Sequence, residues 1–158
     1  MIAVVGFIYN SELSNAIRVA GWAIPAIQTV HILAIAGLLA SAIFLNLRLV
    51  GWLGTHEDTL PMVDRFQSPL WASLFVLAIS GSLLIWAEPD RVLLNQSFWI
   101  KMGLLAIGII LVFMTRQRLM QRGGEGVRPP LKDYLVGLAA LTLWAWVIVY
   151  GRWIAYTY

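Results

Sequence analysis

Four long apolar runs, separated by short polar connections, dominate the pattern of the chain. They cover residues 22–49, 69–87, 98–114 and 134–154, and each is bounded by charged residues, prolines or glycines. A helix rises about 1.5 Å per residue, so about 20 residues cross the roughly 30 Å hydrocarbon layer of a bilayer. Because the runs are apolar on all sides and not along one stripe, they predict four transmembrane helices.

A different pattern precedes the first run, over about residues 2–19. Residues 1–9 are apolar, whereas residues 11–19 (SELSNAIRV) mix polar and charged side chains. No basic residue precedes the apolar part, which argues against a cleaved signal, and the mixture suits a short helix along the membrane interface. The sequence therefore predicts an all-α integral membrane four-helix bundle with a short N-terminal interfacial helix, in a single domain over residues 1–158.

The composition supports burial in a bilayer. Of the 158 residues, 60% are hydrophobic and 12% are charged, which is too apolar for a soluble domain of this size. The chain has no cysteine, so disulfides, thiolate metal sites and cysteine nucleophiles are excluded. The net charge of +3 forms no basic stripe with interleaved aromatic residues, so we expect no nucleic-acid partner. The expected partners are membrane lipids and other membrane subunits or further copies of this chain.

The distribution of basic residues predicts the orientation of the helices. Cytoplasmic connections of membrane proteins are enriched in Lys and Arg. Seven such residues fall in the connections after the first and third runs, namely Arg48, Arg65, Arg116, Arg118, Arg122, Arg128 and Lys132. The opposite side carries Arg18, Arg91 and Arg152. Both termini are therefore expected outside the cytoplasm, and the half of the bilayer on their side is called the outer half.

His31 is the first candidate for a functional side chain. It is the one histidine inside a spanning run, where an ionisable side chain is costly and marks a functional hypothesis. Gln28 lies one turn away on the same face and is a candidate hydrogen-bond partner. The alternative is a neutral core histidine that only bonds a neighbouring helix.

Lys101 is the second candidate and opens the third run in the segment FWIKMG. Its ammonium could bind a carboxylate, a quinone oxygen or an anionic headgroup near His31. The alternative is a lysine that extends to the headgroup layer. Counting turns from the helix ends places Ser80 and Gly81 of the second run at the same depth, so the predicted cofactor-binding set is His31, Lys101, Gln28, Ser80 and Gly81.

Other polar groups give weaker candidates. The acidic residues all fall outside the hydrocarbon runs, which disfavours a proton-coupled carrier. His56, Glu57 and Asp58 resemble a surface metal patch, but they follow the far end of the first run and cannot join His31.

Three segments carry a resemblance to known proteins. HILAIAGLLASAIFLNLRLVG, SPLWASLFVLAISGSLL and NQSFWIKMGLLAIGIILVF together resemble a poorly characterised family of small bacterial four-helix membrane proteins. Their layout is also similar, more weakly, to the membrane domain of copper-resistance protein D and to the bacterial membrane-bound protoporphyrinogen oxidase. The resemblance to the oxidase implies a role in haem binding or catalysis for His31 and Lys101 only. It also implies the bacterial cytoplasmic (inner) membrane.

The chain departs from four-helix di-haem cytochromes. Even one bis-histidine haem needs two histidines on facing helices, and the spanning runs here carry one. Two functions remain open. The first is a small subunit of a redox or electron-transfer assembly with an outer-half pocket for haem b, a quinone or a porphyrin-like ligand, in which His31 is an axial haem ligand. The second is a non-catalytic structural or accessory subunit of a larger membrane complex. Whether the chain is an enzyme, the sequence leaves open.

Overall fold

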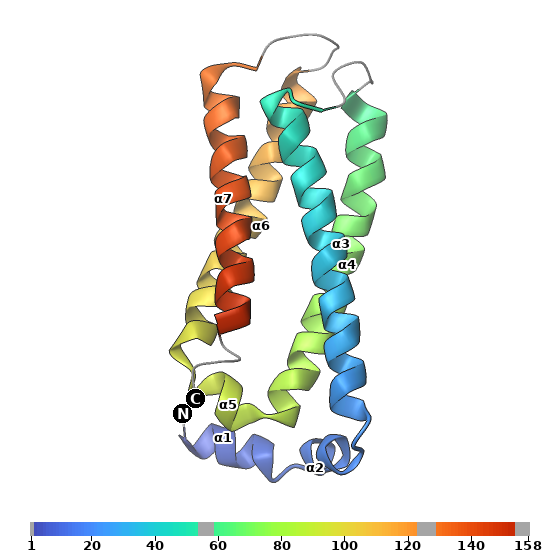
Figure 1. The fold of residues 1–158 in the computed structure, drawn as a ribbon, viewed down its shortest axis with the longest axis vertical. Helices are drawn as coiled ribbons and strands as arrows, with labels where there is room; N and C mark the ends of the chain where they lie inside the picture. Colours follow the sequence, from blue (N-terminus) through green and yellow to red (C-terminus); the bar gives the residue numbers. More distant parts are fainter. Residues whose placement is uncertain (1, 54–58, 123–128, 154–158) are drawn as a thin grey trace.

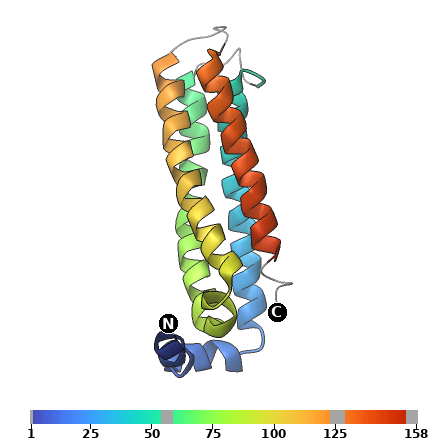
Figure 2. The same cartoon turned by 90° about the vertical axis from the view of Figure 1, so that its left-hand side faces the viewer.

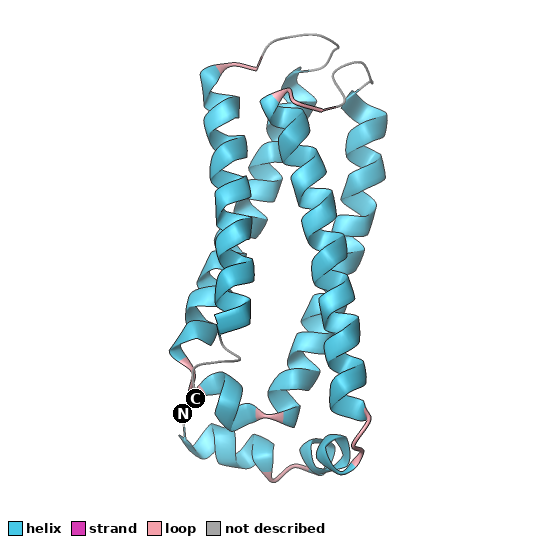
Figure 3. Ribbon diagram, viewed as in Figure 1, coloured by secondary structure: helices cyan, strands magenta, loops and turns pink. Residues whose placement is uncertain are grey.

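A computed structural model describes residues 2–53, 59–122 and 129–153, and within these ranges the chain is helical throughout, with short connections (Figure 3). The four long helices are α3 (Ala23–Val50), α4 (Thr59–Ala87), α6 (Gln96–Arg122) and α7 (Leu131–Trp153). All four are long and apolar enough to cross a membrane. The predicted all-α fold with four membrane-spanning helices is confirmed. The three short helices are α1 (Ile2–Tyr9), α2 (Glu12–Val19) and α5 (Pro89–Leu93).

The long helices extend beyond the apolar runs that predicted them. The second spanning helix begins at Thr59 and not at residue 69, so Pro69 lies inside α4. The third continues to Arg122, beyond the predicted end at residue 114. An apolar run marks the part of a helix that needs hydrocarbon around it, whereas backbone hydrogen bonding continues into the polar layer. The hydropathy of the sequence therefore predicts the apolar part of each helix but not the residue at which the helix ends.

The N-terminal segment forms two helices where the sequence predicted one. The break is at Ser11, whose backbone is extended and whose Oγ accepts the N–H of Ser14 at 3.2 Å, as expected of a residue that begins a helix. Helices α1, α2 and α5 lie across one end of the bundle (Figures 1 and 2). We call this the capped end, and the opposite end, which carries the α3–α4 and α6–α7 connections, the loop end.

Two helix pairs build the bundle: α3 packs along α4, and α6 packs along α7 (Figure 1). Glycine allows close approach within and between the pairs. A Cβ built on Gly37 of α3 would lie 2.6 Å from Oγ of Ser73 on α4, and one built on Gly137 of α7 would lie 2.5 Å from Cγ2 of Val50 on α3. Small residues at helix contacts are typical of membrane bundles. Gly103 of α6, in contrast, has no neighbouring atom within 4 Å of such a Cβ among the described residues.

Two hydrogen bonds between the described parts of the helix pairs lie in the loop half. The hydroxyl of Thr115 on α6 donates to Oδ1 of Asn46 on α3 at 3.0 Å, and both residues are buried. Arg116 Nε of α6 donates to Oε1 of Gln67 on α4 at 2.6 Å. The hydrophobic core also runs from the middle of the bundle to the loop end, and consists of Leu38, Ala42, Leu45, Leu49, Val63, Leu70, Val112, Leu119 and Trp144.

Candidate functional site

His31 lies on α3 in the capped half and contacts α4. Its Nδ1 is 2.8 Å from Oγ of Ser80, a residue that is 3% exposed. The imidazole itself is half-buried. Ser80 on α4 is thus within hydrogen-bond distance of His31 on α3. This contact brings together two members of the predicted set.

The surroundings of Ser80 favour one tautomer of His31. The single hydroxyl hydrogen of Ser80 can donate to the carbonyl oxygen of Val76, which lies 2.7 Å from Oγ and can only accept. A serine oxygen that has donated its hydrogen can only accept, so Nδ1 of a neutral His31 donates to it. Nε2 then carries the lone pair. In this form the imidazole can accept a proton or coordinate a metal ion through Nε2.

Gly81 leaves space beside the His31 ring. A Cβ built on Gly81 would lie 3.5 Å from Cε1 of His31, which is ordinary van der Waals contact. A methyl group at this position would touch the ring, and a larger side chain would push it away from Ser80. Ser80 therefore hydrogen-bonds the imidazole, and the missing side chain of Gly81 leaves room for the ring.

Lys101 approaches the same region from α6. Its side chain lies against α7, where a Cβ built on Gly151 would be 3.7 Å from Cε and 3.8 Å from Nζ. No hydrogen bond or ion pair of Lys101 is found within the described residues. His31 and Lys101 therefore both lie in the capped half, on different helix pairs.

Gln28 does not join this group. Its side chain is exposed. The hydrogen-bond partner of His31 is Ser80. Gln28 and His31 share a face by their spacing, but Ser80 has its oxygen directly at Nδ1. The structure shows no hydrogen bond between Gln28 and His31, and the partner of Nδ1 comes from the neighbouring helix α4.

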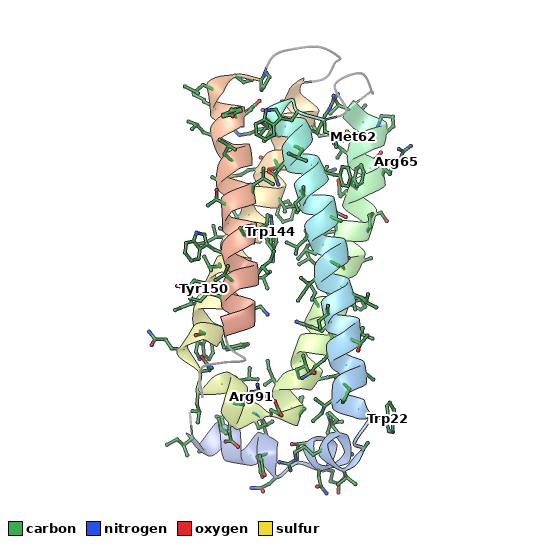
Figure 4. The ribbon with its side chains drawn as sticks, in the orientation of Figure 1. Trp22, Met62, Arg65, Arg91, Trp144 and Tyr150 are labelled. Carbon is green, nitrogen blue, oxygen red and sulfur yellow. The ribbon has the colours of Figure 1, made fainter. Side chains whose placement is uncertain are left out.

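The capped half around His31 and Lys101 lacks a buried apolar core. On the capped side of Leu38 and Trp144, the buried residues among the described parts of α3, α4, α6 and α7 are Ala34, Ser80 and Ala87. In this half the two helix pairs diverge (Figures 1 and 4). The described contacts here run within pairs, from His31 to Ser80 and from Lys101 to Gly151. His31 and Lys101 thus each contact the other helix of their own pair.

Trp144 lies where the core ends and the capped half begins. It is 2% exposed, and its ring packs on Gly108 of α6. Figure 4 shows it pointing from α7 toward the middle of the bundle. Its Nε1 has no hydrogen-bond partner within the described residues. Trp144 could not be singled out from the sequence, because one tryptophan among 8 carries no distinguishing local pattern.

The structure shows no metal-binding group of three or more His, Asp or Glu side chains within the ranges that it describes. The sequence candidate formed by His56, Glu57 and Asp58 lies outside those ranges.

A comparison with protein families matches residues 17–157 to a family of unknown function, DUF6644. No curated protein matches the chain. No solved structure matches it either.

Proposed function

The chain belongs to the DUF6644 family, and we propose that it is a small membrane subunit of a redox assembly that binds a flat redox-active ligand beside His31. Haem b is the ligand that the chemistry of the site favours, ahead of a quinone or another porphyrin-like molecule. His31 would be an axial ligand of the haem iron.

The observation that carries this proposal is the hydrogen bond from His31 Nδ1 to Ser80 Oγ. Histidines that bind metals nearly always donate their second ring N–H to an oxygen, which fixes the tautomer and the orientation of the ring. Ser80 supplies that oxygen because its own hydrogen is engaged by Val76. A histidine that served packing alone would not need Nε2 to be left as a free acceptor.

Lys101 indicates a second chemical property of the proposed ligand. An ammonium without a described partner in an apolar region calls for an anionic or carbonyl oxygen. The propionates of haem and the carbonyls of a quinone are both such groups. Few side chains of the four long helices are buried in the capped half, so apolar surface there can contact a ligand.

The resemblance to the membrane domain of copper-resistance protein D and to the bacterial protoporphyrinogen oxidase adds limited support. It rests on the short motifs around His31, Ser80, Gly81 and Lys101, of which only His31 and Lys101 carry an implied role in haem binding or catalysis. Haem, when bound, supplies one-electron chemistry, and this chain would bind and orient it. One chain offers one histidine in its spanning helices, so it supplies one histidine ligand to the iron.

The proposal includes a location in the bacterial cytoplasmic membrane with both termini extracytoplasmic. The excess of Lys and Arg at the loop end supports this orientation, since such residues favour the cytoplasmic side. His31 and Lys101 then lie in the outer half. With almost no soluble surface, the subunit would meet its redox partners through contacts within the membrane.

An absorbance spectrum of the protein, expressed with added haem precursor and purified in neutral detergent, tests the proposal. We expect a Soret band in the native protein and its loss in His31→Gln, which keeps a polar side chain but removes the imidazole. His56→Gln is the matched control, because it changes the other histidine of the chain.

Three results would contradict haem binding: no Soret band in the native protein, an undiminished band in His31→Gln, or equal loss in both variants. If the purified protein also fails to bind a quinone and His31→Gln assembles normally, the role of a non-catalytic structural subunit replaces the proposal. That alternative predicts a colourless protein whose partners are retained without any ligand.

A further inference from the structure

Two buried polar atoms on helix α2 have no hydrogen-bond partner within the described residues. They are Oγ of Ser14, a residue that is 0% exposed, and Nη1 of the half-buried Arg18. The two residues are four positions apart and therefore share one face of α2. Ile17 is buried on the same side. This is the face that α2 turns toward the ends of α3 and α4.

The guanidinium of Arg18 is held in a fixed orientation. Its Cζ lies 3.7 Å from the ring centroid of Tyr9, and its Nη2 donates to the carbonyl oxygen of Tyr9 at 2.9 Å. This bond satisfies a carbonyl at the end of α1, which has no partner within its own helix. With Nη2 engaged on Tyr9, Nη1 is left as the donor on the buried side.

The charge of Arg18 is not neutralised by the residues that the structure describes, among which it forms no ion pair. The end of α4 packs on α2, and a helix C-terminus attracts cations, but Nη1 makes no hydrogen bond to its carbonyls. Helix α3 begins at Ala23, shortly after α2, and no side chain caps its N-terminus. A helix N-terminus attracts anions, so it favours the same ligand charge as Arg18.

The depth of this site in a bilayer corresponds to the headgroup layer. Helix α3 has 28 residues and is therefore about 42 Å long, which equals the roughly 40–45 Å thickness of a bilayer with its headgroups. Arg18 and Ser14, beside the end of α3, then lie at the level of lipid phosphates. A phosphate oxygen is an acceptor that can take hydrogen bonds from a guanidinium and a hydroxyl together.

We propose that Arg18 and Ser14 bind the phosphate of an anionic phospholipid at the capped end, in a site separate from His31. Arg18 supplies the charge through Nη1, and Ser14 supplies a second donor through its hydroxyl. The bound lipid connects α2 to the ends of α3 and α4 and stabilises the cap against the bundle. The inference is independent of any ligand at His31.

Thermal unfolding of the delipidated protein in neutral detergent, followed by tryptophan fluorescence, tests this site. Phosphatidylglycerol should raise the midpoint of the native protein, and phosphatidylcholine or inorganic phosphate at the same concentration should raise it much less. Ser14→Ala should be at least as stable as the native protein without lipid, because it removes a buried hydroxyl that has no partner. The same variant should bind phosphatidylglycerol about tenfold more weakly, since a hydrogen bond to a charged group is lost.

Arg18→Gln should lose the lipid-dependent rise, and Arg91→Gln is its matched control, because Arg91 lies at the same end and pairs with Glu88 at 3.1 Å. Ser14→Ala carries the test alone if Arg18→Gln does not fold. The inference is overturned if Ser14→Ala and Arg18→Gln respond to phosphatidylglycerol as the native protein does. It is also overturned if phosphatidylcholine gives an equal rise, or if inorganic phosphate does, which would assign the site to free phosphate.

Discussion

Ser80 of α4 holds the imidazole of His31 on α3, with 2.8 Å between Oγ and Nδ1. This contact joins two helices and favours one tautomer of the one histidine in a spanning helix, because the hydroxyl of Ser80 can donate to the carbonyl oxygen of Val76. In the ligand-free protein this arrangement favours a neutral imidazole with its lone pair on Nε2, and this state can be measured directly.

We predict that neutral His31 carries its proton on Nδ1 in the ligand-free protein. ¹⁵N NMR of histidine-labelled protein in detergent, in a His56→Gln background, distinguishes the two ring nitrogens. Ser80→Ala should abolish the fixed Nδ1–H form, because the accepting oxygen is gone. Ser82→Ala is the control: Ser82 also donates to the carbonyl four residues before it, Ala78, at 2.7 Å, but is exposed. An unchanged ring spectrum in Ser80→Ala would contradict the assignment.

We predict that one added methyl group at Gly137 destabilises the bundle. Alanine there would place its Cβ 2.5 Å from Val50 Cγ2 and 3.3 Å from the backbone oxygen of Asn46, so α7 and α3 must move apart. Overpacking of this kind costs about 1–3 kcal/mol. Gly103→Ala is the matched control, since its methyl group meets nothing within 4 Å and alanine favours the helix. Equal denaturation midpoints of the two variants in detergent would refute close packing at Gly137.

We predict that Thr115→Val weakens the junction of the helix pairs in the loop half. Valine keeps the shape of threonine but removes the hydroxyl that donates to Asn46 Oδ1 at 3.0 Å. Hydrogen bonds between membrane helices contribute on average about 0.6 kcal/mol and at most about 1.7. A double-mutant cycle with Asn46→Ala, measured by unfolding in detergent, gives the interaction energy. Strictly additive effects of the two substitutions would show that the hydrogen bond contributes nothing.

We predict that the capped end is extracytoplasmic. Because the chain lacks cysteine, single cysteines can be introduced at Val19 near the capped end and at Leu131 near the loop end, where the native side chains are 77% and 73% exposed. An impermeant thiol reagent should label Val19→Cys in intact cells and Leu131→Cys only after lysis. Labelling of Leu131→Cys alone in intact cells would reverse the orientation inferred from the basic residues.

Much of the fold follows from hydropathy, because a backbone in hydrocarbon must satisfy its own hydrogen bonds and does so as a helix. The ends of α4 and α6 do not follow from it, since both helices continue through polar sequence. The break between α1 and α2 depends on a local hydrogen bond of Ser11 that the sequence pattern signals only weakly.

The candidate site, like the fold, could be predicted only in part from the sequence. The sequence alone predicted that His31, Ser80 and Lys101 lie at similar depths, because depth follows from counting residues along helices of known rise, and the contact of His31 with Ser80 agrees with this. Only the tertiary structure decided that Ser80 and not Gln28 meets the imidazole, and that Lys101 lies beside Gly151. Rotation of each helix about its axis is set by packing at close contacts such as Gly37 with Ser73. Apolar surfaces that face lipid on every side give no sequence signal for that rotation.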